Sequence, residues 1–237
     1  MKNIFVYIGS RNKDSRLFRY TYQIIDFVRN HCNAVGNIDI YSPLNCNLHP
    51  STGCKNCFQK GFCPNEESPS DDGELIKTKI EQADIVILAS PVYSHNVSSD
   101  MKVLIDRLSY WAHIFKLAGK SGVIVTTAES NGAQFVADYL TKIMTYMGAS
   151  IEHIVNFVNS EQDLAELYAE EAAHKIIEIC DDSYHVTPTS QQELTFQTLK
   201  LILLDYPRDH FEYRYWKDHG LFDCQSYEEL VDKYVKV

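Results

Sequence analysis

The sequence contains no apolar stretch as long as a membrane-spanning helix, which needs about 20 such residues. The apolar run near the start, residues 4–8, is followed by Gly9 and Ser10 and not by the small-residue cleavage site of an export signal. We therefore expect neither a membrane anchor nor secretion, and we predict a cytoplasmic protein.

Basic residues are scarce as well. Lysine and arginine number 22 against 32 aspartates and glutamates, which gives a formal net charge of -10. Nucleic acids are held mainly by clustered basic side chains, so this balance argues against nucleic acid as the main partner. It leaves room for a phosphorylated small molecule in one local pocket.

Cysteine, in contrast, is not scarce. The chain has seven, and an odd number without a recognisable secretion signal predicts reduced thiols in place of a disulfide framework. A chain of 237 residues also buries enough surface to fold without such staples. Three of the seven cysteines lie close together in the stretch "TGCKNCFQKGFC", residues 52–63.

Strand-like and helix-like segments alternate over residues 1–180. We expect strands over residues 4–9, 37–42, 83–93, 121–128 and 149–158, and helices over residues 15–30, 73–82, 98–115, 133–148 and 161–180. This alternation predicts a parallel sheet with helices on both faces, and five such strands fit the doubly wound order 2-1-3-4-5. The predicted fold class is therefore α/β, in a domain that spans residues 1–184.

The remaining residues, 185–237, are predicted to form a helical C-terminal extension that is wholly helical from residue 191 on. This extension is rich in aromatic residues, which we expect to lie in the core or at a subunit interface. Ser226 and Glu229 have the spacing of a capping box for the last helix. On the strength of the aromatic residues we expect a homodimer or a higher homo-oligomer.

Ligands of open parallel sheets bind outside the carboxyl ends of the strands, where the strand order reverses. Three loops are predicted to meet there: residues 9–15, 90–98 and 126–132. The first loop, "GSRNKDS", runs from a buried strand into a helix N-terminus, where backbone N–H groups and Arg11 or Arg16 favour a phosphate. It matches neither the P-loop nor the G-x-G-x-x-G pattern, and an ordinary strand-to-helix turn remains open as an interpretation.

The second loop, "SPVYSHNVSSD", offers an exposed aromatic residue and several small polar ones before a helix whose N-cap is Ser98 or Ser99. Tyr93 and the backbone amides are suited to cover a flat heterocycle, although a surface loop with a packed tyrosine gives the same pattern. His95 is a candidate for substrate contact or simply an exposed residue. On the following helix, Lys102 and Asp106 are spaced as a structural ion pair. The third loop, "TTAESNGA", supplies small residues that permit close backbone approach.

Together these loops resemble the NAD(P)H-dependent FMN reductases of the flavodoxin-like superfamily, in the branch that includes iron–sulfur flavoproteins. "GSRNKDS" is similar to that family's phosphate loop, with Asn12 where an arginine is common. "SPVYSHNVSSDMKVLIDR" is similar to its Ser-Pro-x-Tyr motif and the helix behind it, and "GCKNCFQKGFC" followed by "DD" resembles its cysteine-bearing loop.

The resemblance implies a flavodoxin-like fold, a noncovalent FMN and NAD(P)H as co-substrate. It implies hydride transfer to a small acceptor such as a quinone or a flavin, or, as an alternative, a non-enzymatic electron carrier for a protein partner. No acid–base pair is required, and no catalytic side chain is assigned. The FMN contacts that it implies come from Ser10, Asn12, Ser15, Arg16, Leu17, Pro91, Val92, Tyr93, Ser94, Asn96, Thr127, Ala128 and Glu129.

The cysteine loop remains open between several interpretations. An iron–sulfur site of this branch takes four cysteines, and Cys54, Cys57 and Cys63 match the last three while Ser51 stands at the first. A zinc site would also need a fourth ligand, from Cys46 or His49. We favour a structural loop beside the flavin over a cluster, a metal site, or redox-active or substrate-binding thiols.

Overall fold

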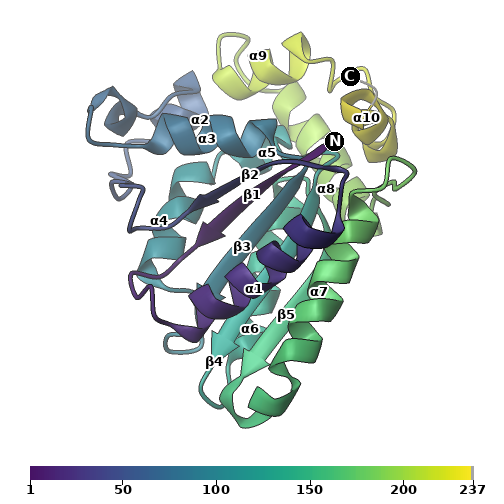
Figure 1. Cartoon of the computed structure of the whole chain (residues 1–237). Helices are drawn as coiled ribbons and strands as arrows, with labels where there is room; N and C mark the ends of the chain where they lie inside the picture. The colour runs from purple at the N-terminus through teal and green to yellow at the C-terminus, as the bar shows by residue number, and fades with distance from the viewer. Residues whose placement is uncertain (236–237) are drawn as a thin grey trace.

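The computed structural model describes residues 1–235 as a three-layer α/β structure (Figure 1). A five-stranded sheet with the order β2-β1-β3-β4-β5 forms the middle layer, and every neighbouring pair of strands is parallel. Its strands are β1 (Lys2–Ile8), β2 (Val35–Tyr41), β3 (Ile85–Pro91), β4 (Ser121–Ala128) and β5 (Ser150–Val158). The predicted fold class and strand order are confirmed.

The central strands owe their position to continuous apolar sequence. β4 is buried at every residue and β3 at every residue except Pro91. Strands covered by helices on both faces need apolar side chains at successive positions, unlike the alternating pattern of a sheet with one wet face. β2 is partly exposed, as an edge strand of the sheet.

Helices cover both faces of the sheet. One face carries α1 (Arg16–His31) and α7 (Ala165–Ile179), whose apolar sides share one core cluster with the strands. The other face carries α3 (Gly73–Gln82), α4 (Ser99–Leu108), α5 (Trp111–Ile114) and α6 (Ala133–Tyr146). Within residues 1–235 no helix combines the length and the apolar character that crossing a membrane requires.

Two expected helices differ in the structure. The helix expected over residues 98–115 is broken after Leu108 into α4 and α5, and it ends at Phe115 in a left-handed conformation with φ of 47°. The helix expected from residue 161 begins as a 3₁₀ segment, Asn159–Leu164, because Glu161 has non-helical backbone angles. Local sequence patterns locate helix ends poorly, since capping and packing decide them.

The C-terminal extension is helical as expected, but non-helical segments separate its helices, so it is not wholly helical from residue 191 on. It consists of α8 (Ser190–Leu204), α9 (Phe211–Asp218) and α10 (Tyr227–Val235), which pack over the α5 and α6 side of the domain (Figure 1). Ser226 caps α10 as expected by accepting from the Glu229 N–H, but the Glu229 carboxylate accepts from the Gln225 N–H and not from that of Ser226.

The aromatic residues of the extension lie mainly in the core of the chain itself. Phe196, Trp216 and Tyr227 have exposed fractions of 0% and surround Phe115 of the domain. The Trp216 indole donates to the His113 carbonyl at 2.7 Å. The extension thus shares one apolar core with the sheet domain, and the boundary between residues 184 and 185 stays a prediction.

Candidate flavin site and cysteine loop

The first loop joins the carboxyl end of β1 to the N-terminus of α1. Ser15 caps α1 by accepting from the Phe18 N–H at 3.4 Å, and Asn12 closes the preceding turn by accepting from the Asp14 N–H at 3.1 Å. The Ser10 hydroxyl is buried and accepts from the Asn12 N–H. The first turn of a helix leaves its backbone N–H groups without intrahelical acceptors, so this end of α1 has the electrostatic character of an anion site.

Ser98 ties this loop to the start of α4. Its hydroxyl donates to the Gly9 carbonyl at 2.6 Å and accepts from the Met101 N–H at 3.1 Å, and the residue is 2% exposed. A Cβ at Gly9 would lie 2.8 Å from the Met101 Cβ and 2.9 Å from the Ser98 hydroxyl. The first loop therefore lies directly on the N-terminus of α4, and Ser98, not Ser99, is the cap.

The second loop forms a tight turn that the sequence pattern did not reveal. Tyr93 and Asn96 exchange two backbone hydrogen bonds, of 2.9 and 3.0 Å, and Ser94 and His95 between them have φ values of 49° and 60°. Non-glycine residues in the left-handed region cost roughly 1–3 kcal/mol each and persist only where the surroundings hold them. Tyr93 is 60% exposed, so its ring projects from the turn toward solvent.

The third loop holds the second one in place. The His95 ring lies 3.0 Å from the Asn131 side-chain oxygen and stacks on Phe135, with 5.3 Å between ring centroids. Gly132 has φ of 88°, and a Cβ there would approach His95 and Val92 to 2.9 Å. Only glycine suits this position, both for its backbone angle and for the close approach.

Arg16 connects the first and third loops across the edge of the sheet. Its guanidinium donates to the Glu129 carboxylate at 2.5 Å, to the Ala128 carbonyl at 3.3 Å and to the Asn159 side chain at 2.6 Å. Arg11 pairs instead with Asp100 at the start of α4. Both arginines near the first loop are therefore already engaged with protein groups.

The structure thus brings the three predicted loops to one edge of the sheet. The residues proposed for FMN contacts all lie on these loops or at the starts and ends of the elements beside them. The contacts of His95 with Asn131 and Phe135 and the pairing of Arg16 with Glu129 were not expected. In the sequence, these contacts are indicated only by Gly132 of the third loop, which lies between Asn131 and an apolar helix.

Residues 2–163 match the family described as NADPH-dependent FMN reductase, which is more than half of the chain. The chain belongs to this family. An iron–sulfur flavoprotein of Archaeoglobus fulgidus is 33% identical over 177 residues, which cover 71% of this chain and 78% of that protein. A second iron–sulfur flavoprotein, from Methanocaldococcus jannaschii, is 39% identical over 88 residues, 37% of this chain and 44% of that protein.

Solved structures show the same fold at low sequence identity. An NADH:FMN oxidoreductase in its apo form aligns with a TM-score of 0.53 and 19% identity, over 81% of this chain and 94% of that one. An azoreductase from Bacillus anthracis aligns with a TM-score of 0.59 and 13% identity, over 76% and 99% of the two chains. At these identities the likeness shows the flavodoxin-like fold alone.

The cysteine loop of this family member lies at the opposite end of α4 from the flavin-site loops. It contains the short helix α2 (Asn56–Lys60), which contacts α9 of the C-terminal extension. A Cβ at Gly61 would lie 2.4 Å from the Phe211 ring, so the two segments are in close contact. The expected place of this loop beside the flavin stays a prediction.

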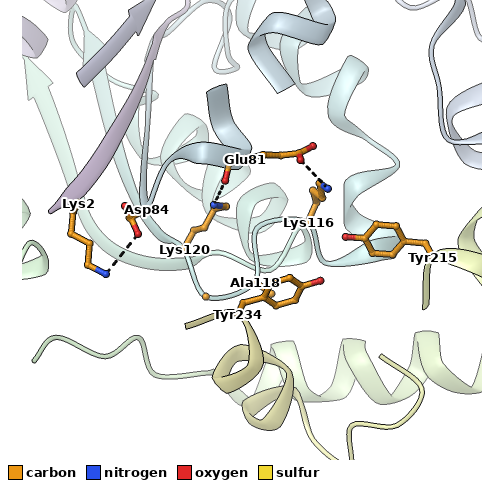
Figure 2. A pocket seen from close by; sticks show the side chains of 9 residues that line it. Lys2, Glu81, Asp84, Lys116, Ala118, Lys120, Tyr215 and Tyr234 are labelled. Atoms are coloured by element: carbon orange, nitrogen blue, oxygen red, sulfur yellow. Dashed lines mark hydrogen bonds and ion pairs between the residues drawn. The ribbon is translucent and has the colours of Figure 1, made fainter. Parts of the chain in front are cut away.

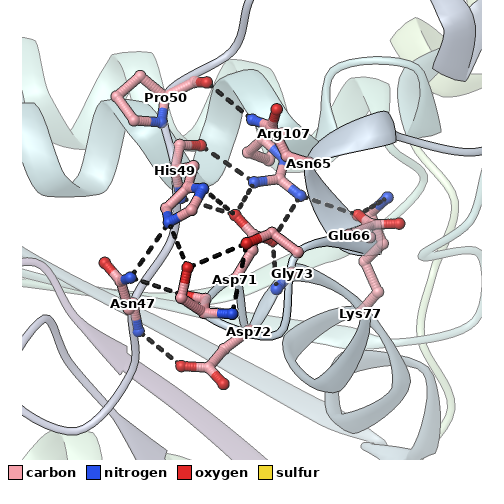
Figure 3. Close-up of polar contacts among 12 residues, drawn as sticks. Asn47, His49, Pro50, Asn65, Glu66, Asp71, Asp72, Gly73, Lys77 and Arg107 are labelled. Atoms are coloured by element: carbon pink, nitrogen blue, oxygen red, sulfur yellow. Dashed lines mark hydrogen bonds and ion pairs between the residues drawn. The ribbon is translucent and has the colours of Figure 1, made fainter.

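A buried ion-pair network anchors the cysteine loop to α4 (Figure 3). The Arg107 guanidinium donates to both carboxylate oxygens of Asp71, at 2.6 and 2.9 Å, to Glu66 at 3.0 Å and to the His49 carbonyl at 3.0 Å. Burial by itself raises the pKa of Asp71, but the bonds from Arg107 and from the His49 and Gly73 amides lower it overall. Lys102 and Asp106 form the predicted exposed pair on the same helix.

A separate cavity of about 420 Å³ lies beside the amino end of β1, between the domain and the extension (Figure 2). Three lysines and two tyrosines line it, and the charged groups are already paired, Lys116 with Glu81 at 3.1 Å and Lys2 with Asp84 at 3.7 Å. Lys120 donates to the Glu81 carbonyl, and burial lowers its pKa. With its charges satisfied, this cavity indicates no particular ligand.

Proposed function

We propose that the protein is an FMN-dependent oxidoreductase that passes electrons from NADH or NADPH to a small acceptor such as a quinone or a flavin. The observation that carries this proposal is the meeting of the three loops at the carboxyl edge of β1, β3 and β4, in a chain of the FMN reductase family. The names of its relatives, two iron–sulfur flavoproteins and an FMN-dependent NADH:quinone oxidoreductase, agree with it.

The residues present fit a phosphate and a flat ring. The proposed phosphate site is the start of α1, where Arg16 and Leu17 lie in the first helical turn and Ser15 and Asn12 lie in the loop before it. Leu17 is buried, so its share in binding would come from the backbone. The Arg16 side chain is paired with Glu129 on the third loop.

The proposed ring site lies between Pro91–Ser94, with Asn96, and Thr127–Glu129. Thr127 and Ala128 are buried, and the Val92 N–H donates to the Thr127 carbonyl at 2.9 Å, so the two walls are joined at their base. FMN, when bound, supplies the hydride chemistry. The task of the chain is to hold the ring, keep one face open and exclude water, and no acid–base side chain is needed for it.

An anaerobic absorbance spectrum of the purified protein, before and after addition of NADPH, tests this proposal. The expected result is a flavin spectrum that bleaches on addition of NADPH and recovers when a quinone is added. A protein that binds no FMN even after reconstitution would refute it.

A second function, electron transfer to a protein partner, has support in the names of the iron–sulfur relatives. It predicts a flavin that NAD(P)H does not reduce within the time of mixing but that dithionite does. Rapid reduction by NADPH, followed by turnover with a quinone, distinguishes the enzyme from the carrier.

The proposal includes a cytoplasmic location and a homodimer or higher homo-oligomer. The aromatic residues of the extension no longer support self-association, because they are buried within the chain. Exposed apolar side chains of α8 support it instead, among them Leu194 at 62% and Leu201 at 69%. Sedimentation of the full chain tests this. A sedimenting mass of one chain at micromolar concentration, with FMN bound, would exclude a stable dimer.

A further inference from the structure

The cysteine loop encloses a small cavity of about 70 Å³. Three free thiols line it together with the Ser51 side of the loop and the C-terminal end of α4. The three thiols differ in exposure: Cys54 is exposed, while Cys57 and Cys63 are partly buried.

The residues of the loop do not fit an iron–sulfur cluster of the kind that the relatives' names imply. Such clusters are held by four cysteine thiolates, and here Ser51 stands at the first of the four positions. Cys46 does not line this cavity and is buried elsewhere, with an exposed fraction of 6%. Within residues 1–235 no group of three or more His, Cys, Asp or Glu side chains is arranged to hold a metal ion.

The surroundings give the two thiols of the Cys-x-x-Cys pair different chemistry. Cys54 accepts hydrogen bonds from the Asn56 backbone N–H and from Thr52, which lower its pKa and favour the thiolate. Burial raises the pKa of Cys57, and the neighbouring Cys63 adds to this. An exposed thiol of lowered pKa, three residues before a partly buried thiol on the same cavity, suits attack on a disulfide and resolution of the product.

Polar contacts with α4 hold the chain on both sides of the cysteine loop. Arg107 fixes the segments on either side of it through Asp71, Glu66 and the His49 carbonyl (Figure 3). Lys55, between the two cysteines, has φ of 61°, an unfavourable conformation for a residue with a side chain. Lys55 is the N-cap of α2, directly after the exposed Cys54.

We propose that this loop is a thiol–disulfide exchange site for small disulfides, with Cys54 as the attacking thiol and Cys57 as the resolving thiol. The Cys54 thiolate attacks one sulfur of a small disulfide, forms a mixed disulfide and releases one thiolate. The Cys57 thiol then loses its proton to solvent and attacks the Cys54 sulfur, which releases the second thiolate. The two cysteines lose two electrons, and the small disulfide gains them and two protons.

This site does not depend on the proposed flavin function, because no step uses NADPH or FMN. The test treats the fully reduced full-length protein with oxidised glutathione under anaerobic conditions, followed by acid quenching, alkylation and peptide mass spectrometry. In the wild type we expect a Cys54–Cys57 disulfide. Cys57→Ser is expected to stop at a glutathione adduct on Cys54, and Cys54→Ser to react about tenfold or more slowly, with no adduct at residue 54.

Cys32→Ser is the matched control, because Cys32 is partly buried and lies outside the loop, and it is expected to react as the wild type does. Three results overturn the proposal: no reaction of the wild type, a wild-type rate in Cys54→Ser, or a disulfide between Cys57 and Cys63 as the main product.

Iron content provides a second test. Anaerobic reconstitution with ferrous iron and sulfide is expected to leave the wild type without stoichiometric iron. Ser51→Cys supplies the fourth thiol, and iron uptake by this variant alone would support the proposal by showing what the loop lacks. Uptake by neither protein supports the premise that the wild-type loop takes no cluster, since the shape of the loop would then exclude one. Stoichiometric iron in the wild type would overturn it.

Discussion

Replacement of Ser98 by alanine probes the junction on which the candidate flavin site is built. The Ser98 hydroxyl has two roles: it caps α4 through the Met101 N–H and donates to the Gly9 carbonyl where β1 enters the first loop. Alanine removes both bonds and leaves the buried carbonyl without this donor. The change is small in volume, so packing around residue 98 is otherwise preserved.

The expected cost follows from those two bonds. Loss of a serine N-cap costs about 0.5–2 kcal/mol. A buried acceptor left without a partner costs about 1–3 kcal/mol. Because the two bonds share one hydroxyl, their costs need not add fully, and we expect Ser98→Ala to lower the free energy of unfolding by about 2–4 kcal/mol.

Urea unfolding followed by the fluorescence of Trp111 and Trp216, both fully buried, measures this change. Ser99→Ala is the control, since Ser99 is exposed and adjacent, and its expected effect is within about 0.5 kcal/mol. The two variants also resolve which serine caps α4. Equal losses in both, or a wild-type midpoint in Ser98→Ala, would refute the reasoning. FMN affinity, measured by flavin fluorescence, is expected to fall in Ser98→Ala alone.

Four further predictions concern other parts of the structure. Arg107→Ala leaves the buried Asp71 carboxylate without its partner and should lower the free energy of unfolding by about 3–5 kcal/mol, against about 0.5 kcal/mol for Lys102→Ala on the same helix. Because the folded-state pKa of Asp71 lies below its ordinary value of 3.8, its contribution is complete at neutral pH. That contribution is lost as the pH falls through 3.8 toward the lower folded-state value. The difference in free energy of unfolding between the wild type and Asp71→Asn should therefore become smaller in urea titrations at acid pH. A difference that does not change with pH would contradict this. Gly132→Ala, at φ of 88°, should lower the free energy of unfolding by about 1–3 kcal/mol and weaken FMN binding. An unchanged urea midpoint would show that the third loop accommodates the alanine without strain. Trp216→Ala should cost about 3–5 kcal/mol, and a loss below 1 kcal/mol would mean that the extension is not part of the common core.

The strands of the sheet were the most predictable part of the fold. A strand buried on both faces requires an uninterrupted apolar run, and the segments at residues 85–90 and 121–128 have one. The helix over residues 98–115 was less predictable, because regular helix is interrupted at Ser109 and Tyr110 although both residues keep right-handed helical backbone angles. Packing of Trp111 and Phe115 against the C-terminal extension accompanies that break, and a sequence window does not contain such distant partners.

The sequence by itself determined the α/β class and which loops follow the strands, because hydrophobic periodicity and chain order are properties of neighbouring residues. The strand order was expected from the usual topology of doubly wound sheets, and the structure confirms it. The sequence also showed that one ligand position of the cysteine loop is occupied by Ser51. Only the tertiary structure decided that Ser98 fastens the first loop, that His95 packs on Phe135 and that Arg107 is buried with Asp71. Each of these contacts joins residues on separate elements, so it exists only once the elements have packed.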